Sequence, residues 1–63
     1  MKTIIENHHE AANHLEQAAK HHLEAAKHLI EGDHEMAHYS TTLAHGHIAH
    51  ACYAQNKILK QYA

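Results

Sequence analysis

The feature that most constrains this chain is a single turn signal, Gly32-Asp33, in a sequence without proline. Glycine is favoured just past the end of a helix, and aspartate is favoured as the N-cap of the next one. The pair predicts a helix over about residues 3–31, a turn at 32–33 and a second helix over about 34–62. Because so short a connection makes helices antiparallel neighbours, the sequence predicts an all-α fold in which residues 1–63 form a single helical hairpin.

The first half carries a seven-residue repeat, in which residues 11–17, 18–24 and 25–31 read AANHLEQ, AAKHHLE and AAKHLIE. Inward positions that alternate steps of four and three are typical of packed helices. In the first helix we expect them at Ile4, His8, Ala11, Leu15, Ala18, His22, Ala25 and Leu29. In the second helix we expect Ala37, Ala44, Ala51 and Ile58, flanked by Ser40, His47 and Ala54 and by Ile48 and Tyr62.

Alanine at so many inward positions predicts closely spaced helices, near the short end of the ~8–10 Å range. Gly46 lies inside the second helix, where glycine costs ~1 kcal/mol relative to alanine. We therefore expect the backbone of another element to approach closely at Gly46.

The size of the chain predicts self-association. A lone domain of 63 residues buries only ~60% of its unfolded surface, and such domains are commonly stabilised by disulfides, metals or association. Cys52 is the only cysteine, which excludes an internal disulfide. The apolar stripe is also wider than one partner helix can cover. It is widened by Leu23, Ile30, Met36, Leu43, Ile48 and Leu59. We therefore expect a homodimer that forms a four-helix bundle.

The charge of the chain depends on its eleven histidines. The net charge is −2 with neutral histidines, and 11 − 2 = +9 if all are protonated. A slightly acidic chain without arginine argues against nucleic acid as a partner. No stretch is apolar enough for a signal peptide or a membrane span. We expect a cytoplasmic protein with Cys52 as a reduced thiol.

Facing residues of an antiparallel hairpin have a nearly constant sum of residue numbers. His28 with His38, His21 with His45, and His14 with Cys52 all share the sum 66. Acidic residues lie one turn away, and His, Cys and carboxylate side chains are ligands that suit Zn, Cu, Ni or Co. The predicted metal ligands are His14, His21, His28, His38, His45 and Cys52. Glu24 and Glu31 are expected either to bind the metal or to accept hydrogen bonds that fix the imidazole tautomers.

A solvated polar flank explains the same residues. At ~100° per residue, His14, His21 and His28 lie roughly 130° from the apolar centre of the first helix. His38, His45 and Cys52 lie similarly far out on the second helix. On this alternative, histidine simply replaces the usual lysine and glutamate on the helix surfaces.

The remaining histidines form two further groups. His8, His22 and His47 are expected to face inward, where packing is a simpler role than metal binding, although each has a twin in a symmetric dimer. Within residues 45–50, His47 and His50 share a helix face and His45 does not.

Four stretches of the chain are distinctive. They are Ala18-Ala19-Lys20-His21-His22, Glu31-Gly32-Asp33-His34-Glu35, Ala37-His38 and Leu43-Ala44-His45-Gly46-His47. This pattern, over roughly residues 8–51, resembles a widespread set of short, histidine-rich bacterial helical-hairpin proteins. The resemblance implies a bacterial origin and a hairpin fold, and implies no particular activity. The chain departs from the pattern after about Ala51, where it becomes polar and free of histidine.

These observations predict a non-enzymatic bundle that binds a divalent transition metal as a buffer, store or sensor. No nucleophile, acid and base are placed together, so we do not expect an enzyme. One alternative is a structural or interaction bundle with pH-responsive histidine faces. Another is a haem-binding bundle with His22 or His47 as an axial ligand.

Overall fold

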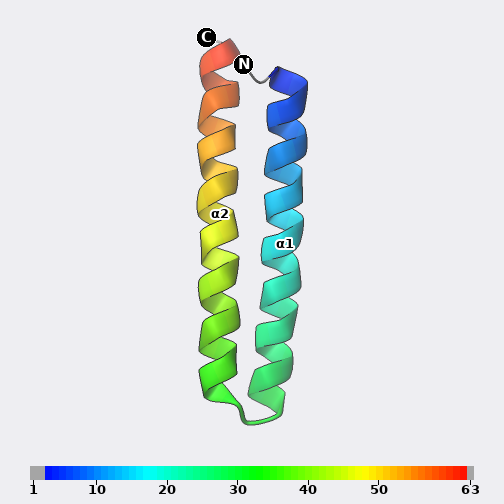
Figure 1. Ribbon diagram of the computed structural model, residues 1–63, viewed down its shortest axis with the longest axis vertical. Helices are drawn as coiled ribbons and strands as arrows, with labels where there is room; N and C mark the ends of the chain where they lie inside the picture. Colours follow the sequence, from blue (N-terminus) through cyan, green and yellow to red (C-terminus); the bar gives the residue numbers. More distant parts are fainter. Residues whose placement is uncertain (1–2, 63) are drawn as a thin grey trace.

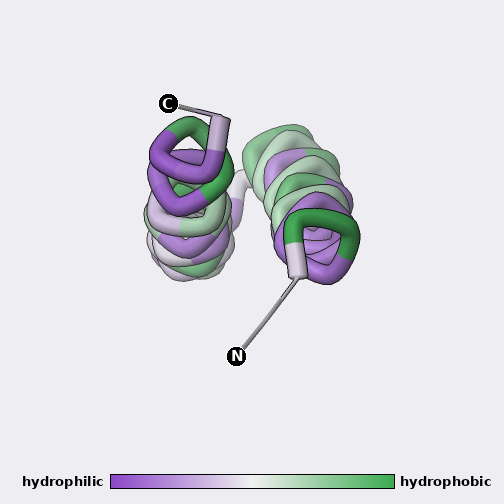
Figure 2. The backbone as a smooth tube through the Cα atoms, turned by 90° about the horizontal axis from the view of Figure 1, so that it is seen from above, coloured by the Kyte–Doolittle hydropathy of each residue, from purple (hydrophilic) through white to green (hydrophobic). Residues whose placement is uncertain are grey.

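The computed structural model describes residues 3–62, which form two antiparallel helices, α1 (Ile4–Ile30) and α2 (His34–Tyr62). The helices lie side by side in a single layer that measures 47 × 16 × 13 Å (Figures 1 and 2). The predicted all-α helical hairpin is confirmed. The expected bounds differ from the observed ones by one residue at each end of α1 and coincide with them in α2.

Thr3 caps the start of α1 with its side chain. Its hydroxyl oxygen accepts a hydrogen bond from the backbone N–H of Glu6 at 3.1 Å. The Glu6 carboxylate in turn lies 3.4 Å from the Thr3 hydroxyl and is an acidic side chain in the first turn. A threonine followed three residues later by a glutamate is the capping-box pattern, which satisfies free N–H groups at a helix start.

The turn between the helices is fixed by backbone hydrogen bonds and one side chain. Gly32 has φ +81°, and its N–H donates to the carbonyl of Leu29 at 3.1 Å. The N–H of Asp33 donates to the carbonyl of His28 at 2.8 Å, which completes a Schellman motif. The Asp33 carboxylate then accepts from the N–H of Met36 at 3.1 Å and caps α2. The roles expected for Gly32 and Asp33 are therefore confirmed.

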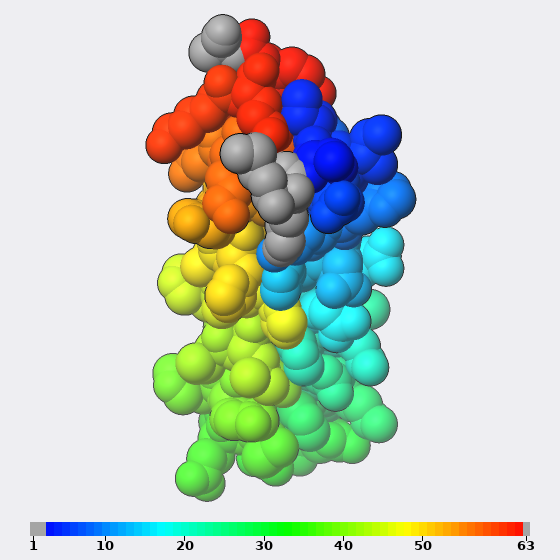
Figure 3. All heavy atoms as spheres, turned by 45° about the horizontal axis from the view of Figure 1, so that its top comes forward, coloured from blue at the N-terminus to red at the C-terminus, as the bar shows by residue number. Residues whose placement is uncertain are grey.

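The interface between the helices consists mainly of small side chains. Its buried apolar residues are Ala11, Ala18 and Ala25 of α1 with Ala37, Ala44, Ala51, Ala54 and Ile58 of α2. Ser40 and Asn7 are buried among them. Short side chains let the two backbones approach closely, and the atoms of the two helices meet along the face shown in Figure 3. The expected seam of α2 and its flanking residues Ser40, His47 and Ala54 are buried or half-buried. Ile48 and Tyr62, which we expected on the other flank of this seam, are exposed, so that part of the expectation was wrong.

The inward positions of α1 differ from the expectation at every second step. His8, Leu15, His22 and Leu29 are exposed. The residues that face α2 instead are Ile4, Asn7, Ala11, His14, Ala18, His21, Ala25 and His28, which we call the buried row. Both sets alternate steps of three and four, and they share their alanines. The buried row is the one that brings His14 beside half-buried His47 of α2, where the two imidazoles share a hydrogen bond.

Gly46 does not mark a close approach. It is exposed, and a Cβ atom added to it would have no other atom within 4 Å. The expectation of a close backbone contact at Gly46 was therefore wrong. Its absence of a side chain serves no packing purpose in the hairpin.

Over residues 3–62, neither helix combines the length and the apolar character that crossing a lipid bilayer requires.

Candidate functional site

Four imidazole rings gather between the helices near the middle of the hairpin. His14 and His21 come from α1, and His47 and His50 come from α2. The ring of His14 lies 4.9 Å from that of His50 and 5.2 Å from that of His47, between ring centroids. The rings of His21 and His47 stack at 5.6 Å with an interplanar angle of 12°. We call these four residues the imidazole cluster.

The closest contact in the imidazole cluster joins Nδ1 of His14 to Nδ1 of His47 at 2.9 Å. A neutral imidazole carries a proton on one nitrogen and a lone pair on the other. One of these two Nδ1 atoms must therefore donate and the other accept. If both rings were protonated, two N–H groups and two positive charges would face each other, so the contact requires at least one neutral ring.

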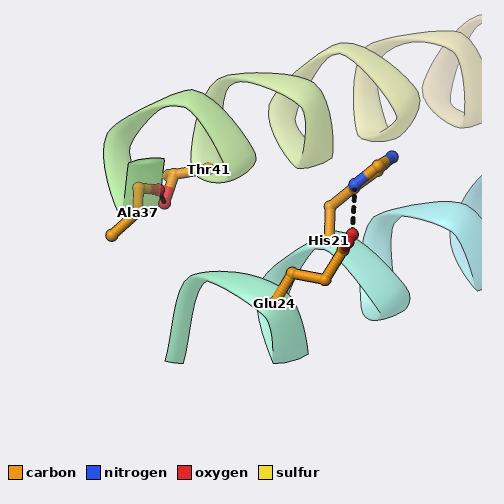
Figure 4. A network of polar contacts seen from close by, with 4 residues as sticks. All are labelled: His21, Glu24, Ala37 and Thr41. Carbon is orange, nitrogen blue, oxygen red and sulfur yellow. Dashed lines mark hydrogen bonds and ion pairs between the residues drawn. The ribbon is translucent and has the colours of Figure 1, made fainter. Parts of the chain in front are cut away.

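A carboxylate orients the ring of His21. Nδ1 of His21 lies 2.8 Å from Oε1 of Glu24, one turn further along α1, and the imidazole extends from α1 toward α2 (Figure 4). A proton on Nδ1 donates to this carboxylate, which leaves the lone pair on Nε2. Histidines that bind metals commonly have such a carboxylate partner, because it fixes the tautomer and raises ligand basicity.

His28 and Glu31 repeat this arrangement less tightly, with Nδ1 of His28 3.5 Å from Oε1 of Glu31. Both predicted carboxylates thus lie beside a predicted histidine of their own helix, at a spacing of three residues.

Burial lowers the pKa of the His47 imidazole below its ordinary value, and the neighbouring rings of His14, His21 and His50 lower it further. His47 is half-buried, so its charged form loses hydration. The three neighbouring imidazoles add repulsion when they are protonated. His47 is therefore held in the neutral form, which is the form that binds metal ions.

The pairs expected from the sum of residue numbers are replaced by other partners. His14 contacts His47 and His50 rather than Cys52, and His21 stacks on His47 rather than pairing with His45. His38, His45 and Cys52 are exposed. A constant sum of residue numbers pairs residues at the same level along the hairpin axis. The imidazoles instead contact residues about one helical turn away on the neighbouring helix.

The predicted position of the α1 histidines was also wrong. His14, His21 and His28 are half-buried members of the buried row, not outlying flank residues. The apolar centre expected for this helix includes Leu15 and Leu29. Both leucines are exposed, so the side of the helix that faces α2 is a different one.

Two members of the imidazole cluster, His47 and His50, were not among the predicted metal ligands. The prediction that they share a helix face is confirmed, because both rings contact His14. That shared face, set against a histidine at every seventh residue of α1, is the sequence pattern that identifies the cluster.

As the side chains lie, no three His, Cys, Asp or Glu residues within 3–62 form a group that could hold a metal ion. The imidazole cluster presents one convergent pair of nitrogens, His14 with His47, and two further rings beside it.

The other histidines expected to face inward do not do so. His8 and His22 are exposed. His8 lines an open groove of about 500 Å³ at the end of the hairpin that carries the termini, together with Leu15, Ile58, Leu59 and Tyr62. Nε2 of His8 lies 3.3 Å from the Tyr62 hydroxyl. Neither His22 nor His47 lines this groove, so nothing in it supports haem binding by those two residues.

Comparison of the chain with protein families, curated proteins and solved structures found no match. The resemblance to short histidine-rich bacterial hairpin proteins stays a prediction, and the function must be argued from the site itself.

Proposed function

We propose that this chain is a non-enzymatic protein that binds a divalent transition metal through the imidazole cluster. The observation that carries the proposal is the approach of Nδ1 of His14 and Nδ1 of His47 to 2.9 Å, inside a group of four histidines. A metal ion would replace the proton between these two nitrogens and accept both lone pairs.

The ligand type, rather than the separation of the two nitrogens, indicates the metal. Imidazole nitrogens suit Zn(II), Cu(II), Ni(II) and Co(II), and both rings would turn so that their lone pairs converge on the ion. A given nitrogen site binds Cu(II) more tightly than Ni(II), Co(II) or Zn(II). We therefore propose a divalent transition metal and take Cu(II) as the first probe.

The other two histidines of the imidazole cluster lie next to the His14–His47 pair. Glu24 orients His21 so that its lone pair is on Nε2, and His50 stacks on His14 from the exposed side. A third or fourth ligand from the cluster would require these two side chains to rotate. Occupancy would then fall in acid, because ligands must be neutral to bind.

The test is a calorimetric titration of untagged protein with Cu(II), Ni(II) and Zn(II). The variants His14→Ala and His47→Ala should weaken Cu(II) binding by at least about tenfold, the lower limit for loss of even an outer partner. His9→Ala and His34→Ala are matched controls, because both residues are exposed and lie outside the imidazole cluster. Circular dichroism must show equal helicity in all four variants. No Cu(II) or Ni(II) binding, or an equal loss in the controls, would reject the site.

We further propose that the working unit is a homodimeric four-helix bundle. Many large apolar side chains are exposed on the single hairpin, among them Leu15, Leu29 and Leu59. Two hairpins that pack together would bury these side chains.

A second candidate function is a pH-responsive structural bundle, which the lowered pKa of His47 favours. On this alternative the imidazole cluster binds protons and no metal. The pH-responsive function would be favoured if the free energy of unfolding did not change on addition of Cu(II), Ni(II) or Zn(II) but decreased as the pH was lowered.

A further inference from the structure

α1 carries a second regular row beside the buried row. Its positions lie one residue further along, and they keep the same alternation of steps of three and four. The residues of this second row are Ile5, His8, Ala12, Leu15, Ala19, His22, Ala26 and Leu29. Every one of them is exposed. A helix with two adjacent rows of this kind is typical of bundles in which it packs on two neighbours.

α2 carries a matching exposed row on the same side of the hairpin. It consists of His38, Thr41, His45, Ile48, Cys52, Gln55, Leu59 and Tyr62. The two rows adjoin, because His8 and Leu15 line the same groove as Leu59 and Tyr62, and His8 contacts Tyr62. Together they form one broad side of the hairpin, which we call the uncharged face.

None of the sixteen residues of the uncharged face is Asp, Glu or Lys, although the chain has twelve such residues. Glu24 and Glu31 follow the other edge of the buried row of α1. A helix surface that stays in water normally carries charges of both signs. This asymmetry indicates that the uncharged face is not the one that meets solvent.

We propose that the uncharged face is where a second copy of this chain binds. In a two-fold symmetric dimer each residue of the patch meets another residue of the same patch. A fixed charge near the axis would meet its own copy, and one elsewhere would be buried against an uncharged side chain. A face without fixed charges avoids both costs. Its leucines and alanines also supply the ridges and grooves by which helices pack.

The size of the face fits this partner. The broad side of the hairpin extends over 47 × 16 Å, which is of the same order as the ~800 Å² that each partner contributes to a standard interface. Monomeric proteins rarely expose apolar patches of more than a few hundred Å². The second copy would also bring His38, His45 and Cys52 between the two hairpins rather than between the helices of one.

This inference rests on the proposed homodimer and is independent of metal binding by the imidazole cluster. Sedimentation of the metal-free chain at pH 8 over a range of concentrations should give a dimer. Leu15→Lys and Ile48→Lys should weaken dimerisation by at least about a hundredfold, because each would bury an unpaired ammonium group. Tyr39→Lys and Tyr53→Lys are the controls, since both tyrosines are exposed off this face.

A second measurement needs no variant and therefore no assumption about folding. Cys52 lies on the uncharged face and its thiol is free. Its alkylation by iodoacetamide at pH 8 should slow as the protein concentration rises through the dimer dissociation constant.

The outcomes separate the two ideas. A monomer at all concentrations would overturn both the dimer and its interface. A dimer that tolerates Leu15→Lys and leaves Cys52 freely reactive would overturn the interface alone. Binding to neutral lipid vesicles by a chain that stays monomeric would assign the face to a different partner. None of these results depends on the copper titration.

Discussion

At the scale of single residues, the two glycines show that the same residue type can be required at one position and replaceable at another. Gly32 adopts φ +81°, which side chains with a Cβ atom rarely adopt, and it closes the Schellman motif. Gly46 lies in a helix interior with open space around its Cα atom. The sequence identified the role of Gly32 because the following Asp33 supports it. No residue next to Gly46 in the sequence indicates a role for it, and no other element of the hairpin packs against it.

Opposite stability changes are therefore expected at the two glycines. Gly46→Ala should raise the free energy of unfolding by about 0.5–1 kcal/mol, because alanine has less unfolded-state freedom to lose. Gly32→Ala should lower it by about 1–2 kcal/mol, because the turn requires a left-handed backbone. Urea unfolding followed by circular dichroism measures both. A destabilising Gly46→Ala would mean that a second copy or another partner occupies the space beside this residue.

Glu24 provides a residue-scale test of the proposed metal site. Glu24→Gln removes the charge that orients His21 and should weaken Cu(II) binding by about 10–100-fold. Glu16→Gln removes an equal charge from an exposed position of α1 and should leave the affinity unchanged. Equal affinities for both variants and the parent chain would show that His21 does not bind the metal.

At the scale of the helices, the two elements were not equally predictable. In α2 the buried alanines and Ile58 form the expected seam, although Ile48 and Tyr62, expected beside it, are exposed. In α1 the alanine pairs allow two adjacent rows, and both rows contain histidines, but Leu15 and Leu29 lie in the exposed one. Hydrophobicity alone favours burial of the row that contains Leu15. His14, which hydrogen-bonds His47 of α2, lies in the other row. The hydrophobic pattern of one helix cannot predict a polar contact that depends on the position of the other helix.

Asn7 of the buried row offers a test of how polar groups act in this interface. It is 2% exposed, and its Oδ1 has no hydrogen-bond partner among residues 3–62. Its Nδ2 donates to Gln61 at 3.5 Å, a long contact. Asn7→Leu should raise the free energy of unfolding by about 1 kcal/mol, because it replaces an unsatisfied polar group by an apolar one.

The same thermal or urea unfolding measurement checks this prediction, with Asn13→Leu on the exposed side of α1 as the control. A loss of stability in Asn7→Leu alone would indicate that the hydrogen bond to Gln61 contributes more than the burial of leucine gains.

At the scale of the whole molecule, stability is expected to depend on pH through His47. Its pKa in the folded hairpin lies below that of a free histidine, about 6.5. The unfolded chain then binds a proton more readily than the folded one as the pH falls. The contribution of His47 is fully present above about pH 6.5 and is lost as the pH falls through the lowered value.

The midpoint of thermal unfolding, measured between pH 8 and pH 4, should therefore fall on the acid side of about pH 6.5. In His47→Gln this dependence should be smaller, since the central ring of the cluster no longer titrates. His34→Gln, at the exposed start of α2, should keep the dependence of the parent chain. A midpoint that does not change with pH would remove the basis for a pH-responsive function.

The shape of the molecule has a consequence for how it opens. Both ends of the described chain lie at one end of a 47 Å rod, and the three-residue connection 31–33 joins the helices at the other end (Figure 1). Each segment of the hairpin contacts only the segments next to it along the long axis. The two helices can therefore separate progressively, starting from the end that carries the termini. The imidazole cluster lies about halfway along the hairpin, and its contacts between the helices would oppose their separation at that point. Amide hydrogen exchange should then be fast beyond the cluster toward the termini and slowest between the cluster and the turn.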